Sequence, residues 1–151
     1  MKKEDGEFLI KRLESGNEYD LYRPSSDLSI VLRLMLHNHM KLAHICDMTV
    51  CDIYQWHIDA ADGKLPIKKD KRGIEILISK LSKEDYAVVK EHIKKKNLSP
   101  NDKLITVTKR ALRYKYKNLV NVNYSEENAP EMGQFYFAGL GIEDCKSMKR
   151  N

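Results

Sequence analysis

The 151-residue chain lacks the features that define several large classes of protein. No apolar run approaches the roughly 20 residues that a membrane-spanning helix needs. The first residues, Met-Lys-Lys-Glu-Asp, contain no apolar segment of the kind that a signal peptide requires. The three cysteines are an odd number without a framework spacing, which favours reduced thiols over a disulfide scaffold. We therefore expect a soluble cytoplasmic protein with no membrane partner and one main domain.

The motifs of the common enzyme classes are also missing. The chain has no glycine-rich phosphate loop, no G-x-S-x-G nucleophile elbow and no H-E-x-x-H zinc motif. The Gly-Leu-Gly at residues 139–141 is followed by Ile-Glu-Asp and not by the rest of a dinucleotide fingerprint. The sequence therefore predicts a protein that is not an enzyme and that uses no cofactor.

Positive charge is present, and it is unevenly distributed. The net charge is +5; residues 1–63 carry 7 Lys/Arg and 11 Asp/Glu, residues 64–117 carry 17 and 6, and residues 118–151 carry 3 and 5. A basic block such as the middle segment can neutralise phosphates in a nucleic-acid complex. Basic helical faces are also ordinary solvated surface, so charge alone leaves both interpretations open.

Apolar spacing and helix-start signals predict a mainly α-helical fold. A helix after Pro24, capped by Ser25 or Ser26, is apolar almost all round and should be central. The first 24 residues hold one short helix, from Phe8 to Leu13, that ends at Gly16. Three further helix starts are indicated by a hydroxyl residue followed three positions later by an acid. These pairs are Thr49 with Asp52, Ser82 with Asp85, and Ser99 with Asp102.

Several later segments carry weaker signals. Residues 74–81 return to a helical apolar spacing after Gly73. Residues 100–119 are ambiguous, because Leu-Ile-Thr-Val-Thr favours a strand while the capped start and the basic residues that follow favour a helix; we interpret them as a helix. Residues 120–124 and 134–142 could be short strands, which would form a small β element near the C-terminus. The helix predicted for residues 100–119 would place four cations on one face: Lys109, Arg110, Arg113 and Lys117.

Residues 40–56 carry the pattern of two helices that meet at a tight turn. The small side chain of Ala43 would let the second helix approach the first. Cys46 and Met48 would fill the corner between them. Ile53 and Trp56, three residues apart, would face inward from the second helix.

This pattern resembles the helix-turn-helix of prokaryotic transcriptional regulators, especially small Cro-like repressors of phage or plasmid type. There, an alanine is followed by a turn, a capped helix and a closing aromatic or aliphatic residue. The resemblance covers Ser25 to Arg72, about a third of the chain. Asp47 holds the turn position that is usually glycine, and aspartate tolerates the left-handed conformation. The resemblance implies a sequence-specific DNA-binding regulator that acts as a homodimer on double-stranded DNA.

The resemblance also implies which side chains would contact DNA. Base edges would be read from the exposed face of the second helix by Thr49, Cys51, Tyr54 and Gln55. Acids on that helix repel phosphate, and no Lys or Arg lies between Lys41 and Lys64. Lysines around the motif can supply phosphate contacts, although the same lysines could be a solvated linker. They are Lys41, Lys64, Lys68 and Lys69.

The alternative function is a protein-interaction module, in which the same helix pair contacts another protein and does not bind DNA.

Histidine and cysteine are concentrated in the same segment. Four of the five histidines and two of the three cysteines lie in residues 37–57. Zinc ligands must converge, and the motif directs Cys46 to the core and Cys51 to the outer face. We therefore expect no metal, but a small buried side chain and scattered surface imidazoles.

These patterns divide the chain into four parts: an N-terminal arm (1–24), a helix-turn-helix unit with a basic loop (25–72), a helical packing and dimerisation region (73–120) and a C-terminal tail (121–151). The tail contains three consecutive aromatic residues among glycines. They could contact a protein partner, although a strand that closes the protein's own core is the favoured interpretation. They are Phe135, Tyr136 and Phe137.

Overall fold

The structure is a computed structural model, and it describes residues 1–16, 25–64, 67–69, 75–77 and 80–142. Within these residues the chain is mainly helical, which confirms the predicted fold class. The elements are α1 (Lys3–Ser15), α2 (Ser26–Asn38), α3 (Leu42–Asp47), α4 (Val50–Ala61), β1 (Ile67–Lys69), β2 (Glu75–Leu77), α5 (Lys83–Lys95), α6 (Lys109–Asn123) and α7 (Gln134–Gly139). The rest of the predicted arm and tail, at 17–24 and 143–151, lies outside the described residues.

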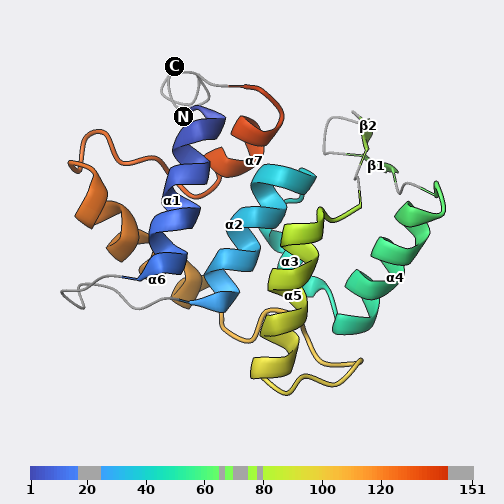
Figure 1. Cartoon of the computed structure of the whole chain (residues 1–151). Coiled ribbons are helices and arrows are strands. Elements are labelled where there is room, and N and C mark those ends of the chain that lie inside the picture. Colours follow the sequence, from blue (N-terminus) through green and yellow to red (C-terminus); the bar gives the residue numbers. More distant parts are fainter. Residues whose placement is uncertain (17–24, 65–66, 70–74, 78–79, 143–151) are drawn as a thin grey trace.

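α2 is the central helix of the fold, as predicted (Figure 1). Every residue from Asp27 to Leu36 is buried, because α1, α5 and α7 pack around the helix and α3 and α6 contact its sides. Ser25 caps it, and its hydroxyl oxygen accepts a hydrogen bond from the backbone N–H of Leu28 at 3.3 Å. A helix that is apolar all round is stable in water only when other elements enclose it in this way.

α1 and α7 both approach α2 closely. The helix predicted from Phe8 to Leu13 is α1, which is longer than expected: it runs over Lys3–Ser15, before the chain turns at Gly16 with φ 76°.

The contact of α7 with α2 depends on a glycine. A Cβ placed on Gly139 of α7 would lie 2.2 Å from the carbonyl oxygen of Leu36. Glycine is therefore required where the backbone of α7 meets that of α2.

The β element lies elsewhere than predicted. Residues 75–77 form β2, which pairs antiparallel with β1, with Ile67 opposite Leu77. The helical prediction for residues 74–81 is therefore wrong over this strand. A short apolar run fits either a strand or a buried helical turn, and its periodicity alone does not separate the two.

The two segments predicted as C-terminal strands are helical. Residues 120–123 complete α6, and residues 134–139 form α7. Phe135 is fully buried where α7 contacts α1 and α2, so the aromatic run closes the protein's own core. The preference of aromatic residues for strands depends on packing against a sheet. In this protein the aromatic residues of α7 pack against helices, and this contact overrides the preference for a strand.

The helix predicted for residues 100–119 begins only at Lys109, with Thr108 as its cap. Of the three predicted caps, those at Thr49 and Ser82 begin helices, but the third closes a turn. The Ser99 N–H donates to the carboxylate of Asp102 at 2.7 Å, and no helix follows. Such local side-chain bonds stabilise turns as well as helix starts, and they do not extend a helix by themselves.

Candidate nucleic-acid interface

α3 and α4 meet at a corner, as the sequence predicts. α3 ends at Asp47, and Met48 and Thr49 are extended before α4 begins. The hydroxyl oxygen of Thr49 accepts from the Asp52 N–H at 3.1 Å, and the Asp52 carboxylate accepts from the Thr49 N–H at 2.9 Å. The left-handed backbone expected at Asp47 is not used, because two extended residues make the turn.

The inner face of the corner is only partly as predicted. Ile53 and Trp56 are buried, with 1% and 8% of their surface exposed. Ala43 is exposed, so its predicted contact with the second helix is wrong. Ile45 takes the inner position of α3 and is fully buried, while Cys46 is half-buried. Because α3 is only six residues long, its single buried position is set by the neighbours that it meets.

The first turn of α4 is covered by the segment 99–104. The N–H of Val50 donates to the carbonyl of Asp102 at 2.9 Å, and the N–H of Cys51 donates to the carbonyl of Pro100 at 2.8 Å. In helix-turn-helix complexes, the N-terminal residues of the second helix contact base edges. In this chain, that end of the helix is hydrogen-bonded to another part of the same molecule.

The four predicted base-contacting residues differ in their surroundings. Cys51 and Gln55 are exposed, while Thr49 is half-buried and caps α4. Tyr54 is half-buried, and its ring lies edge-on to that of Tyr86 in α5, with 6.2 Å between centroids. Burial raises the pKa of Tyr54. Two of the four side chains are therefore open to a ligand.

The exposed face of α4 is acidic. α4 contains Asp52 and Asp59 and no Lys or Arg, and Asp62 caps its C-terminal end. The side-chain amide of Gln55 donates to the Asp59 carboxylate at 2.9 Å, so it is held by a neighbour on the same helix. A surface of this sign repels phosphate.

The predicted phosphate contacts come from the start of α3, the residues after α4 and β1. Lys41 is exposed at the start of α3, and its Nζ lies 5.4 Å from the centroid of the Tyr136 ring in α7. Lys64 is exposed just after α4. Lys68 and Lys69 belong to β1, and their side chains lie outside the described part of the structure.

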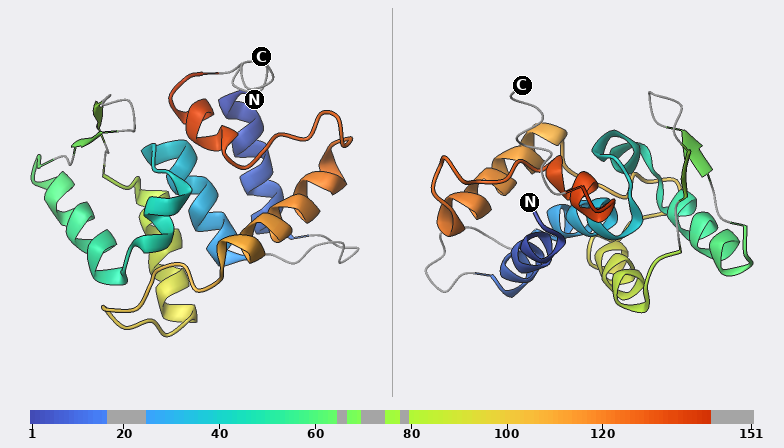
Figure 2. Two further views of the ribbon diagram at one scale, coloured as in Figure 1. Left: turned by 180° about the vertical axis from the view of Figure 1, so that it is seen from behind. Right: turned by 90° about the horizontal axis from the view of Figure 1, so that it is seen from above.

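Exposed cations are gathered on α6. This helix has five Lys or Arg in 15 residues and no acid. The cations predicted to share a face are all exposed, and within the described residues none of them forms an ion pair. We call this group the α6 basic face: Lys109, Arg110, Arg113 and Lys117. α6 and α4 lie at opposite ends of the molecule (Figures 1 and 2).

Two cations of the α6 basic face affect the pKa of a cysteine in α3. Burial raises the pKa of the Cys46 thiol, and the positive charges of Lys109 and Arg113 act in the opposite direction. Cys46 and Cys51 are both free thiols. No cluster of three or more His, Cys, Asp or Glu that could hold a metal ion occurs in the described ranges.

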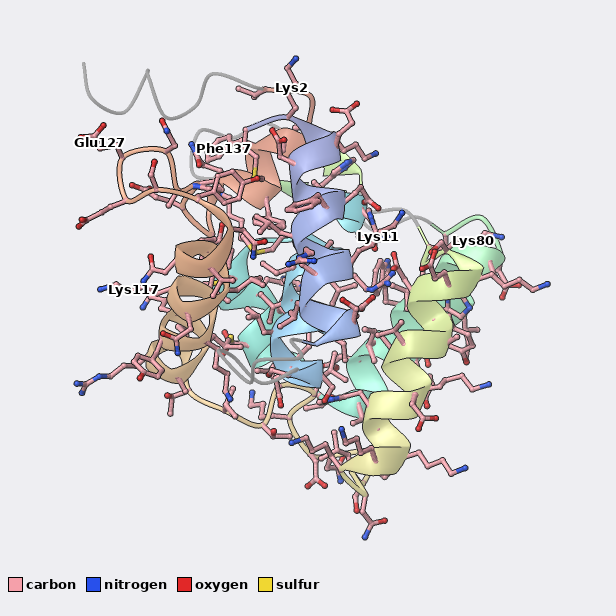
Figure 3. The ribbon with its side chains drawn as sticks, turned by 60° about the vertical axis from the view of Figure 1, so that its left-hand side comes forward. Lys2, Lys11, Lys80, Lys117, Glu127 and Phe137 are labelled. Carbon is pink, nitrogen blue, oxygen red and sulfur yellow. The ribbon has the colours of Figure 1, made fainter. Side chains whose placement is uncertain are left out.

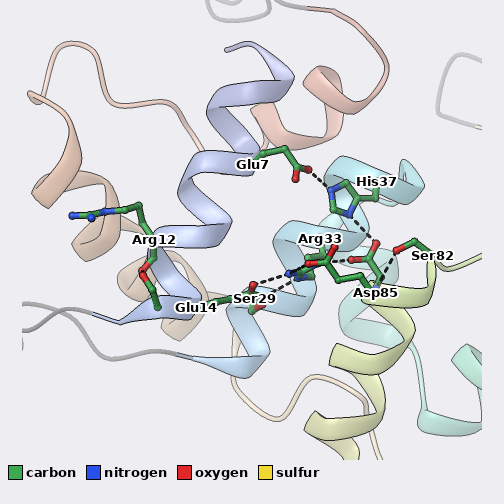
Figure 4. A network of polar contacts seen from close by, with 10 residues as sticks. Glu7, Arg12, Glu14, Ser29, Arg33, His37, Ser82 and Asp85 are labelled. Carbon is green, nitrogen blue, oxygen red and sulfur yellow. Dashed lines mark hydrogen bonds and ion pairs between the residues drawn. The ribbon is translucent and has the colours of Figure 1, made fainter.

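A second group of charges lies inside the fold, between α1, α2 and α5 (Figure 4). Arg33 of α2 is buried; its Nη2 lies 2.6 Å from Glu14 Oε1, and its Nη1 lies 2.7 Å from Asp85 Oδ1. His37, one turn along α2, contacts both Asp85 and Glu7. These carboxylates come from α1 and α5, so the network joins three helices and is already paired within the chain.

Comparison of the chain with protein-family models, with curated proteins and with solved structures finds no match. The resemblance to helix-turn-helix regulators therefore stays a prediction from the sequence. Over the described residues, no helix has the length and apolar character needed to cross a membrane.

Proposed function

We propose that this protein binds double-stranded DNA as a transcriptional regulator, and that the α6 basic face makes the main contact with the phosphates. The observation that supports this proposal is the group of exposed cations on α6, which have no acidic neighbour in the helix and no ion pair among the described residues. Cations that neutralise phosphates release the counterions of the duplex, which is the main source of affinity for DNA of any sequence.

The arrangement of the helix favours an extended anion. Arg110, Arg113 and Lys117 follow the three- and four-residue spacing that puts side chains on one face. Tyr114 lies among them with 68% of its surface exposed, and a tyrosine hydroxyl can donate to a phosphate. Lys109 lies in the first helical turn, where the helix dipole disfavours a cation by about 0.3–1 kcal/mol. A bound phosphate offsets that cost.

We expect the double variant Arg110→Gln/Arg113→Gln to bind a short fluorescein-labelled duplex of random sequence about tenfold more weakly at low salt, because two phosphate contacts are lost. Fluorescence anisotropy measures the affinity. The matched control is Lys11→Gln/Lys80→Gln, which removes the same charge at two positions away from Lys117, one on α1 and one before α5 (Figure 3). Equal losses in the two variants would contradict the assignment to α6.

A second candidate is a protein-interaction module in which the α3–α4 pair contacts another protein. The acidic face of α4 and the segment that covers its first turn favour this alternative. Ile58, on the same helix, has 54% of its surface exposed and could be covered by a partner. Complete absence of duplex binding at low salt would favour this function over the first.

A further inference from the structure

A cavity of about 740 Å³ lies between α6, α7, the start of α3 and the segment that joins α6 to α7. Small-molecule sites in proteins usually have volumes of about 300–1,000 Å³ and mainly apolar walls. Most of the residues that line this cavity are apolar or aromatic. They include Met35, Leu42, Val120, Met132 and Phe137.

Charged side chains surround the apolar part of the cavity. Arg113 and Lys117 lie one turn apart on α6, and Lys41 reaches the same space from the start of α3. Glu126 and Glu131 come from the segment that joins α6 to α7. The helical walls are therefore positive, while the acids are confined to the joining segment.

The segment that joins α6 to α7 is held by one hydrogen bond to each helix. The hydroxyl of Tyr116 donates to the carbonyl of Pro130 at 2.8 Å. The backbone N–H of Glu131 donates to the side-chain oxygen of Gln134, which is buried, at 2.9 Å. The cavity is thus bounded by a segment that is already held in place, which reduces the conformational entropy that the protein loses when a ligand binds.

We propose that this cavity binds an amphipathic carboxylate, whose apolar chain lies against Val120, Met132 and Phe137. The carboxylate lies at Arg113 and Lys117. A guanidinium can bind both oxygens of a carboxylate. This geometry favours a carboxylate head group over a neutral or cationic one. The proposal does not depend on DNA binding, because none of its contacts requires a nucleic acid.

Calorimetric titration of the full chain with dodecanoate, below its micelle concentration, tests the proposal. We expect saturable binding of one molecule per chain. Dodecyltrimethylammonium has the same apolar chain and a cationic head group, and it should bind at least about tenfold more weakly. The proposal would be overturned if dodecanoate did not bind, if its binding did not saturate, or if the two amphiphiles bound equally well.

The variant Gly133→Leu tests the location. Gly133 lines the cavity with φ −61° and ψ −20°, values that any residue adopts, and a Cβ placed there meets no atom within 4 Å. The added side chain should occupy the cavity and weaken dodecanoate binding by about tenfold or more. The control Ala61→Leu makes a comparable addition at an exposed position of α4 and should leave binding unchanged.

Arg113→Gln tests the head-group site at an exposed position that the fold does not require. We expect dodecanoate affinity to fall and the preference over dodecyltrimethylammonium to narrow. Unchanged binding in both Gly133→Leu and Arg113→Gln, with melting temperatures like that of the parent chain, would place the ligand elsewhere and refute the assignment.

Discussion

The contacts of His37 make the stability of the fold depend on pH near neutrality. Its Nδ1 lies 2.8 Å from the carboxylate of Asp85, and its Nε2 contacts the carboxylate of Glu7. The hydrogen bond with Asp85 raises the pKa of His37; burial opposes this effect, and Glu7 adds to it. Arg33 is the cation in the same network, and its own bonds to Glu14 and Asp85 balance its charge. The imidazolium therefore binds α1 and α5 to α2.

We expect the free energy of unfolding to decrease as the pH rises above about 6.5. The folded-state pKa of His37 is raised above the ordinary value of 6.5, so its contribution is complete below 6.5 and is lost as the pH passes the folded value. Hydrogen bonds from His37 and Arg33 lower the pKa of Asp85 despite burial, so the contribution of Asp85 is lost only at acid pH, below 3.8. Burial raises the pKa of the Cys46 thiol, so this group changes the free energy of unfolding only above pH 9.0.

Urea unfolding at about pH 6 and about pH 8.5 measures this dependence. His37→Gln retains a hydrogen-bonding side chain without the charge, and it should reduce the difference between the two pH values. A variant with the same difference as the parent chain would show that another group is responsible.

At the scale of elements, the contact between α7 and α2 depends on close approach of two backbones. We expect Gly139→Ala to destabilise the fold by about 2 kcal/mol or more, because its Cβ would lie 2.2 Å from the Leu36 carbonyl oxygen and the helices would have to separate. Gly133→Ala is the matched control in the same region, since its Cβ meets no atom within 4 Å. Thermal melts followed by circular dichroism measure both. Equal melting temperatures for the two variants would show that α7 is not held against α2.

The helix starts show how far local signals determine an element. The hydroxyl–acid pairs at Thr49 and Ser82 precede residues whose apolar side chains find a core, and helices follow. The pair at Ser99 precedes Leu104 and Ile105, which are buried while the backbone is not helical. The same local bond thus begins a helix or closes a turn, depending on where the next apolar residues must pack.

At the scale of the whole molecule, the basic middle segment of the sequence, residues 64–117, includes the α6 basic face, whose four cations are exposed and form no ion pair among the described residues. On α5, by contrast, lysines alternate with Glu84, Asp85 and Glu91. The acids of α4 lie at the other end of the molecule (Figure 2). A duplex would therefore be attracted to one end of the protein and repelled from the other.

We expect the affinity for a random duplex to fall steeply with salt. If the four cations of the α6 basic face each neutralise a phosphate, the slope of log K against log salt should be roughly −3 to −4, since each contact contributes about −0.9. Arg110→Gln/Arg113→Gln should make the slope shallower by about 2. Anisotropy titrations over a range of salt concentrations measure both slopes. A flat dependence would exclude phosphate contacts as the basis of binding.

The sequence by itself determined the helical fold class, the central place of α2, the caps of α4 and α5, and the face of α6 on which the cations lie. Each of these follows from the periodicity of side chains or from a bond between near neighbours, and both are properties of a short segment. Only the tertiary structure decided that the aromatic tail is a helix, that Ser99 begins no helix, and that a distant segment covers the start of α4. Each of these depends on where residues far apart in the chain meet and bury their surfaces, which no local pattern contains.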